Sequence, residues 1–286
     1  AASDVYKRQA HAHHRILFHE DITGKEITSH LLNAVKKLKN VRMYEYTTLL
    51  DILCDGSKCC GGIIRWPDGR EEQVEADYVI LATGGIGGTY KHSTNFKHLT
   101  GDGVEIARRH NIELKNLDYV QIHPTTLYSD NKEERSFLIS ESVRGEGARL
   151  YDKNMNRFVD ELLPRDLLTQ EIYKQMEKDG TDFVWEDLRT IPRDELISHF
   201  PNIIEHCSQA GYDVFHECIP IVPAQHYFMG GIKVNHNSKT SMDHLYAVGE
   251  TACNGVHGKN RLASNSLLES LVFAKRAAKE IAGERR

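Results

Sequence analysis

The apolar and polar positions of the first third of the chain alternate between helical and strand-like spacing. From Glu26 to Lys39 apolar residues recur at three- and four-residue intervals, as on one face of a helix. We expect a strand over Val41–Tyr46 and short strands over Thr48–Ala76. Asp55-Gly56 and Asp68-Gly69 interrupt the second of these segments, and Asp-Gly pairs favour tight hairpins.

The remaining pattern places a different segment in the middle of an α/β domain. Tyr78–Ala82 is wholly apolar, which is typical of a strand buried on both faces. Further strands are expected at 117–122, 231–234 and 245–248. Between them, the chain from His123 to about Gln225 has longer polar loops, so we expect an insertion at about 122–228. Helices are predicted over Val104–His110, Arg165–Glu177, Asp194–Ala210 and Asn265–Ile281.

Composition narrows the classes of function. The 286 residues include 36 basic and 41 acidic side chains, for a net charge of −5. This balance argues against nonspecific binding of nucleic acid, which needs a basic surface. No apolar run approaches the ~20 residues that span a bilayer. The six unevenly spaced cysteines are not a disulfide framework, so we expect a cytoplasmic, reducing location.

The two ends of the sequence suggest a piece of a longer protein. Ala1–Gln9 has no initiator Met, no apolar period and no signal-peptide core. The last four residues stop just past a helical pattern. We therefore expect a foreign N-terminal segment and further sequence on both sides.

Two histidines stand in locally constrained segments. His123 precedes Pro124, which forces its predecessor into an extended conformation and directs the imidazole out of the end of a strand. His226 lies in a compact segment that ends in Gly230-Gly231. Either one alone could be a capping or buried histidine. The two together favour a ligand site.

Two charged segments allow a structural or a functional interpretation. Ser140–Gly147 alternates charge and glycine, as in a solvated helix start or in a network that orients basic groups toward an acidic ligand. Arg165 follows Pro164 at a helix start, where the helix dipole favours anions. A ligand or partner carboxylate explains that arginine better than the dipole does, and a surface arginine is the alternative.

Glycine-rich turns follow two of the expected strands. Thr83-Gly84-Gly85 could let a ligand approach the backbone, although an ordinary turn is the simpler interpretation, since no G-x-G-x-x-G or G-x-x-x-x-G-K-[ST] motif is present. Glu250 follows another strand and could hold a ribose hydroxyl. A loop containing Arg261 then leads through Ser264-Asn265-Ser266, a helix cap or anion-binding turn, into the last helix.

No metal is expected. Cys54, Cys59 and Cys60 lack the paired spacing of a zinc site. A terminal cluster of histidines is weak evidence for a metal on its own. These histidines are His11, His13 and His14.

As an ordered set, the motifs resemble the succinate dehydrogenase / fumarate reductase flavoprotein superfamily. The resemblance covers about His11–Ile281, and Pro223–Tyr227 and Ala263–Glu269 are most similar to the branch that oxidises L-aspartate. The motifs that carry it are Ala82–Gly85, His123–Thr125, Arg144–Gly147, Arg165-Asp166, His226-Tyr227, Gly249-Glu250 and Asn260-Arg261.

The resemblance implies an α/β fold in which an α+β capping domain, at 122–228, interrupts a Rossmann-like FAD-binding domain at 1–121 and 229–286. The segment that holds the FAD pyrophosphate and a C-terminal helical domain would lie outside the chain. The implied reaction is FAD-dependent oxidation of L-aspartate to iminoaspartate, with oxygen (giving hydrogen peroxide) or fumarate as electron acceptor. It is the first step of NAD synthesis through quinolinate, so a functional link to quinolinate synthase is expected.

The resemblance also assigns roles to residues. His123, His226 and Arg261 would hold the substrate carboxylates, and Arg165 would transfer a proton in the related fumarate reduction or act electrostatically in amine oxidation. Arginine binds carboxylates through two parallel donors, and each charge-assisted hydrogen bond contributes roughly 1.5–3 kcal/mol. The substrate pocket would be lined by Ser140, Glu141 and Arg144, and FAD would contact Thr83, Gly84, Gly85, Glu250, Asn265, Ser266 and Leu267.

One departure keeps alternatives open. The acidic residue that meets the substrate amino group in the aspartate-oxidising branch would fall just before His11, where Arg8 stands. The alternatives are a fumarate reductase or succinate dehydrogenase flavoprotein subunit, and a piece that is inactive as cut and binds no flavin.

Overall fold

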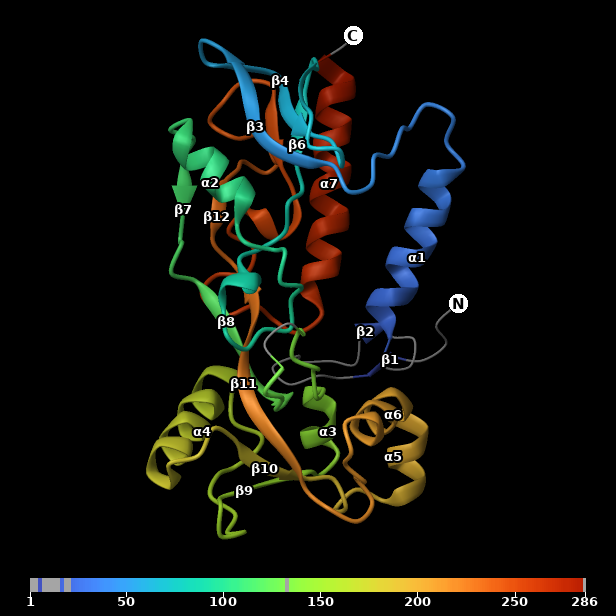
Figure 1. The fold of residues 1–286 in the computed structure, drawn as a ribbon, viewed down its shortest axis with the longest axis vertical. Helices are drawn as coiled ribbons and strands as arrows, with labels where there is room; N and C mark the ends of the chain where they lie inside the picture. Colours follow the sequence, from blue (N-terminus) through green and yellow to red (C-terminus); the bar gives the residue numbers. More distant parts are fainter. Residues whose placement is uncertain (1–4, 7–15, 18–21, 132–133, 285–286) are drawn as a thin grey trace. The chain divides into compact units, whose positions relative to one another are not determined.

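The structure is a computed structural model that describes residues 5–6, 16–17, 22–131 and 134–284 (Figure 1). It is a mixed α/β chain, as the sequence predicted, and it divides into two compact units. Unit 1 comprises 1–32, 87–98 and 121–226, and unit 2 comprises 33–86, 99–120 and 227–286. Most of the predicted insertion, 122–228, lies in unit 1. The assignment of that insertion as a capping domain stays a prediction.

Unit 1 is built on a four-stranded sheet with the order β8-β11-β10-β9. Its strands are β8 (Val120–Leu127), β11 (Ile219–Phe228), β10 (Val184–Asp187) and β9 (Arg149–Tyr151), and its helices are α3 (Glu141–Gly145), α4 (Arg165–Asp179), α5 (Arg193–His199) and α6 (Pro201–Gln209). The unit also contains the short 3-10 turn η1 (Gly87–Thr89). Its core consists mainly of aliphatic side chains from the sheet and these helices, among them Leu150, Leu168, Ile172, Val184, Leu196 and Ile219.

Unit 2 contains the antiparallel sheet β3-β4-β5 and two smaller sheets. The turns at Asp55-Gly56 and Asp68-Gly69 join the strands of the first sheet, as predicted. The strands are β3 (Thr48–Asp55), β4 (Lys58–Arg65), β5 (Glu71–Glu75), β6 (Val79–Leu81), β7 (Leu114–Lys115), β12 (Gly231–Lys233), β13 (Leu245–Ala247) and β14 (Ala252–Cys253). The helices are α2 (Asp102–Arg109), the 3-10 turn η2 (Gly249–Thr251) and α7 (Asn265–Glu284).

Three local predictions were wrong. Val41–Tyr46 is an exposed irregular segment, because no strand lies beside it to complete a ladder. Ile80 of β6 is 46% exposed, so this strand is not buried on both faces. The helix expected over Asp194–Ala210 is broken into α5 and α6 at Phe200-Pro201, since proline has no N–H and disfavours the helical conformation of its predecessor.

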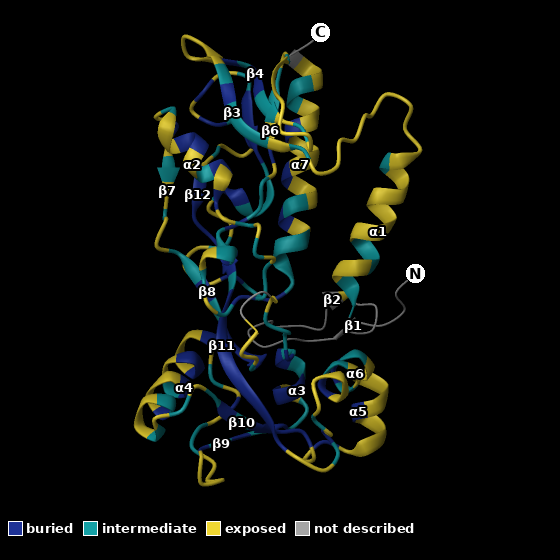
Figure 2. Ribbon diagram, in the orientation of Figure 1, coloured by how far each residue is buried: buried dark blue, intermediate teal, exposed yellow. Residues whose placement is uncertain are grey.

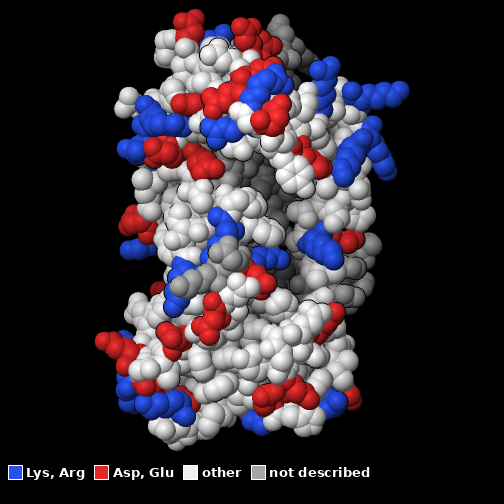
Figure 3. Space-filling view, in the orientation of Figure 1, with Lys and Arg blue, Asp and Glu red and all other residues white. Residues whose placement is uncertain are grey.

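Burial differs sharply between elements. Figure 2 shows β11 buried along most of its length, whereas α1 (Thr23–Lys36) has no buried residue. The short strands β1 (Val5–Tyr6) and β2 (Ile16–Leu17) pair with each other. In the described part of the chain, no helix is both long and apolar enough to cross a membrane. Charges of both signs are interspersed over the face drawn in Figure 3.

The sheet of unit 2 depends on one glycine, and this can be tested. A Cβ on Gly61 in β4 would collide with the backbone oxygen of Val74 in β5, so we expect Gly61→Ala to lower the free energy of unfolding by about 2–3 kcal/mol. Gly56, in the turn of the same hairpin, has φ +59° and open space around it. Gly56→Ala should therefore cost only about 1 kcal/mol, from backbone strain. Urea unfolding followed by circular dichroism measures both, and equal losses would contradict the collision.

Candidate functional site

Adjacent strands of unit 1 bring the two predicted histidines together. His123 lies in β8 and His226 in β11, and these strands are neighbours in the sheet. Their rings meet edge to face with centroids 5.3 Å apart. The His123 side chain is only 1% exposed. The two rings therefore form one cluster, in which His123 is buried and His226 is partly exposed.

The backbone of Thr125 positions the His123 ring. The Nδ1 atom of His123 lies 3.0 Å from the Thr125 carbonyl oxygen and 3.2 Å from the Thr125 nitrogen. Burial lowers the pKa of His123 well below its usual value, and the positive charges of Arg165, His226 and Arg144 lower it further. The ring is thus neutral in this environment. When Nδ1 accepts from the Thr125 N–H, Nε2 carries the hydrogen and can donate to a carboxylate.

A segment distant in sequence positions His226. Its Nδ1 lies 2.8 Å from the Thr94 hydroxyl. Backbone bonds on either side of Gln225 join β11 to His92 and Thr94, and the Gln225 side chain accepts from Ser93 at 2.7 Å. The sequence gave no signal for Thr94, because it lies 132 residues from its histidine and in no recognisable motif.

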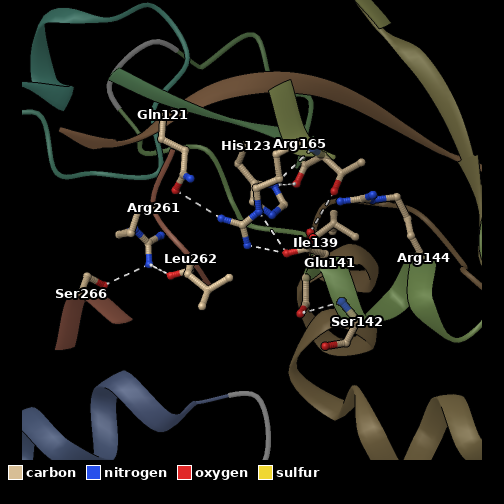
Figure 4. A network of polar contacts seen from close by, with 12 residues as sticks. Gln121, His123, Ile139, Glu141, Ser142, Arg144, Arg165, Arg261, Leu262 and Ser266 are labelled. Carbon is tan, nitrogen blue, oxygen red and sulfur yellow. Dashed lines mark hydrogen bonds and ion pairs between the residues drawn. The ribbon is translucent and has the colours of Figure 1, made fainter. Parts of the chain in front are cut away.

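Arg165 is held by a buried carboxylate (Figure 4). Its Nε and Nη2 atoms both donate to Oε2 of Glu141, the first at 3.0 Å, and Nη1 donates to the Gln121 side chain at 3.3 Å. Arg165 is buried, so the alternative of a surface arginine was wrong. The carboxylate partner that explains an arginine at this helix start is Glu141 of the chain itself. Sequence reasoning did not single out Gln121.

The two neighbouring predicted pocket residues have structural contacts of their own. Glu141 is buried and its Oε2 is engaged by Arg165. Because a carboxylate repels an anionic substrate, Glu141 acts on such a substrate through Arg165. Ser140 is the N-cap of α3, where its hydroxyl accepts from the Ser142 N–H at 3.3 Å. The helix-start interpretation of this segment therefore applies to Ser140.

Arg144 and Glu186 form a second buried polar group. Arg144 Nη1 donates to the Glu161 carbonyl at 2.7 Å, whereas its Nε and Nη2 have no hydrogen-bond partner among the described residues. Both carboxylate oxygens of Glu186 are likewise buried without such a partner. Burial raises the pKa of Glu186 to about 8, with the nearby Arg144 lowering it and Glu161 raising it. Glu186 is therefore mostly protonated at neutral pH. The sequence analysis did not identify it.

Unit 2 contains all seven residues predicted to contact FAD. Thr83, Gly84 and Gly85 follow β6, and the Thr83 hydroxyl donates to that of Thr251 in η2 at 3.0 Å. A Cβ on Gly85 would collide with the carboxylate of Glu250, so any other residue at position 85 would force that carboxylate to move. One oxygen of Glu250 also accepts from the Phe228 N–H at 2.8 Å.

The other three residues predicted to contact FAD lie in the first turn of α7. Asn265, Ser266 and Leu267 follow Ser264, whose φ is +66°. The first N–H groups of a helix have no acceptor within it, and they favour negative charge. The Ser266 hydroxyl accepts from Arg261 Nη1 at 3.3 Å. Arg261 stacks on Tyr227 at 4.6 Å, and the Tyr227 hydroxyl donates to Glu269 of α7 at 3.2 Å.

These features fit FAD. A carboxylate beside a strand end can accept from ribose hydroxyls, and the N-terminus of α7 can face an electron-rich oxygen. No group of three or more His, Cys, Asp or Glu in the described residues could hold a metal. The predicted terminal cluster, His11, His13 and His14, and also Arg8, lie outside the described residues.

Comparison with known proteins decides the family. The family model described as "FAD binding domain" matches residues 4–267. The chain belongs to this FAD-binding family. FAD is therefore its cofactor, in agreement with the prediction.

The curated relatives of this chain carry the name of one particular enzyme. An L-aspartate oxidase from Clostridium perfringens is 52% identical over 96% of this chain, and one from Clostridium acetobutylicum is 48% identical over 96%. The chain spans 62% and 64% of the lengths of these two relatives.

Two solved structures of quinol fumarate reductases have the fold of this chain. A quinol-fumarate reductase with menaquinol superimposes with a TM-score of 0.90 at 33% identity, covering 99% of this chain and 52% of the other. An E. coli quinol fumarate reductase variant gives a TM-score of 0.88 at 31% identity, with 97% and 51% covered. The predicted similarity to fumarate reductase flavoproteins is confirmed.

The buried Glu186 makes stability depend on pH. Its pKa is about 8 in the folded chain against an ordinary 4.5, so folding retains a proton that the unfolded chain releases between these values. Its contribution is full below about pH 4.5 and is lost as the pH rises to 8, by up to about 1.4 kcal/mol per pH unit. Glu186→Gln should remove this slope, as measured by urea unfolding from pH 5 to pH 8. Glu195→Gln, at an exposed position of α5, is the matched control. An unchanged slope in Glu186→Gln would show that Glu186 is ionised.

Proposed function

We propose that this chain carries the FAD and substrate sites of an enzyme that oxidises L-aspartate to iminoaspartate. The electrons pass through FAD to oxygen, giving hydrogen peroxide, or to fumarate. Iminoaspartate then enters quinolinate and NAD synthesis, which links the enzyme functionally to quinolinate synthase. The names of the two Clostridium relatives support this assignment. The six free cysteines suit a reducing compartment such as the cytoplasm.

The cluster of donors around His123 in unit 1 is the observation that carries the proposal. His123, His226 and Arg165 lie in one polar network, with Arg144 close enough to lower the pKa of His123. Such a cluster lacks sufficient negative charge of its own and suits a ligand with two carboxylates. Arg261 lies in unit 2, and its role in holding a substrate carboxylate stays a prediction from the family resemblance.

The side chains have separable roles in this reaction. FAD supplies the acceptor for two electrons. His123 Nε2 and His226 donate to substrate carboxylates. Arg165 stays protonated, because an arginine is not deprotonated in proteins, and Glu141 and Gln121 fix its orientation. Two of its five N–H groups are not used in those contacts and can stabilise negative charge on the substrate. The substrate amine releases its proton to solvent.

A fumarate reductase or succinate dehydrogenase flavoprotein is the second candidate. The TM-score of 0.90 with a quinol-fumarate reductase favours it. For that reaction the family resemblance assigns proton delivery to Arg165, which would be the one step in which its guanidinium releases a proton. Both candidates use the same cluster and differ in whether an amine is bound. A third possibility is that the 286 residues alone are inactive.

Peroxide release distinguishes these candidates. We expect the protein expressed from the complete encoding gene to release hydrogen peroxide with L-aspartate and none with succinate. Succinate oxidation or fumarate reduction without aspartate turnover would instead identify the protein as a succinate dehydrogenase or fumarate reductase flavoprotein. The 286-residue chain alone, incubated with FAD, tests the third possibility. An absence of bound-flavin absorbance would support the hypothesis that this chain is inactive by itself.

Arg165→Lys tests the proposed electrostatic role. Lysine cannot hold Glu141 and Gln121 and also face the substrate, so kcat with L-aspartate should fall at least ~10²-fold. The flavin spectrum should stay unchanged. Arg193→Lys is a matched control, because Arg193 also follows a proline and precedes an aspartate at a helix start but is exposed. Equal kcat/KM in Arg165→Lys and the parent would remove Arg165 from the site.

A further inference from the structure

A second cluster of chemically reactive side chains lies in unit 2, apart from the residues assigned to FAD. It joins β3 to the end of α2. Cys54 is exposed near the end of β3, and its Sγ lies 3.5 Å from Nδ1 of His110. The other ring nitrogen of His110, Nε2, lies 2.7 Å from Oδ1 of Asp51. The imidazole of His110 thus lies between the thiol of Cys54 and the carboxylate of Asp51.

The carboxylate determines which ring nitrogen is the base. Asp51 Oδ1 also accepts from the Ile52 N–H at 2.9 Å and lies 3.6 Å from the guanidinium of Arg109. An ionised carboxylate accepts only, so the His110 hydrogen resides on Nε2 and Nδ1 can accept from the Cys54 thiol, whose other neighbour is Met242 Sδ at 3.7 Å. A nucleophile within reach of a base that a third group orients is the arrangement of an activated nucleophile.

The surroundings favour proton transfer during attack over a thiolate at rest. Burial, the neighbouring thiols of Cys59 and Cys60, and Asp51 raise the pKa of Cys54. The resting group is therefore a thiol that needs a base. His110 is the C-cap of α2, and the C-terminus of a helix stabilises the positive charge that the imidazole acquires.

A second thiol lies opposite the first. Cys59 of β4 is the cross-strand partner of Cys54 in the hairpin. The Cys59 N–H donates to Asp243 and not across the hairpin. The register shifts between Leu53 and Cys54, and from there Cys54–Cys59 and Asp55–Lys58 pair in step up to the turn. In a regular pair of this non-hydrogen-bonded kind, opposed Cα atoms lie about 4.5 Å apart, within the range that a disulfide spans. Cys59 is fully buried, so external reagents reach Cys54 first.

We propose that Cys54 is a peroxide-reactive thiol that His110 and Asp51 activate and that Cys59 resolves. In the first step the Cys54 sulfur attacks one oxygen of hydrogen peroxide and the O–O bond breaks. The thiol proton passes through His110 to the leaving hydroxide, giving a sulfenic acid and water. In the second step the Cys59 sulfur attacks the sulfenic sulfur, giving a Cys54–Cys59 disulfide and a second water. Peroxide is also the product of the proposed oxidase, but the site does not depend on that assignment.

Pulsed alkylation of the full chain tests the activation. The rates at Cys54 and Cys60 are read by peptide mass spectrometry after treatment with iodoacetamide. Since general-base catalysis contributes 10²–10⁴-fold, we expect His110→Asn to slow alkylation of Cys54 at least ~10-fold and Asp51→Asn to slow it less. Cys60, in the same hairpin and partly exposed, should keep its rate in every variant. This constant rate, with unchanged circular dichroism, shows that each variant is folded.

Added hydrogen peroxide tests the oxidation without any turnover of aspartate. Substoichiometric peroxide should give a Cys54–Cys59 disulfide in the parent, and a dimedone adduct at Cys54 in Cys59→Ser. Equal alkylation of Cys54 with and without His110 would overturn the proposal, as would peroxide oxidation that is no faster at Cys54 than at Cys60. Peroxide-dependent oxidation of Cys54 in a protein that does not oxidise aspartate would leave this proposal standing and reject the proposed function.

Discussion

The buried ion pair between Glu141 and Arg165 is the constraint on which the candidate substrate site depends. It joins α3 to the start of α4, and Gln121 ties the same guanidinium to β8. Removing charges from water is costly, and loss of one partner of a buried pair typically costs about 3–5 kcal/mol. The chain therefore holds its arginine in one orientation at the strand that carries His123. The order of β8 and β11 in the sheet then places His226 beside that histidine.

In unit 2, close packing against a glycine sets the position of the Glu250 carboxylate. The Glu250 carboxylate occupies the space that a side chain at position 85 would need, and its bond to the Phe228 N–H fixes it there. The 3-10 turn that carries Glu250 lies against α7, so the glycine turn, the carboxylate and the helix N-terminus are assembled within one unit. Close packing thus fixes the orientation of Glu250 in unit 2, as the buried ion pair fixes that of Arg165 in unit 1.

Local signals predicted much of the fold, and contacts between distant segments explain most of what they missed. The Asp-Gly turns specified two hairpins, and proline or glycine beside His123 and His226 marked both histidines. The tripeptide Pro-Arg-Asp, however, occurs at the start of both α4 and α5. Only Arg165 meets a carboxylate 24 residues away, whereas Arg193 stacks on Phe215 at the surface. No property of the tripeptide distinguishes the two. Glu186 was missed for the same reason, since its burial comes from the surrounding core.

The unbalanced positive environment of His123 has a consequence for the lifetime of the protein. Arg165 and Arg144 lower the pKa of this ring, so an anionic ligand beside it would offset their positive charge. Ligand that binds only the folded state adds about 2.7 kcal/mol of stability at a hundredfold excess over Kd. Under the proposed function, a dicarboxylate bound to the folded chain would raise the folded fraction and with it the resistance to proteolysis.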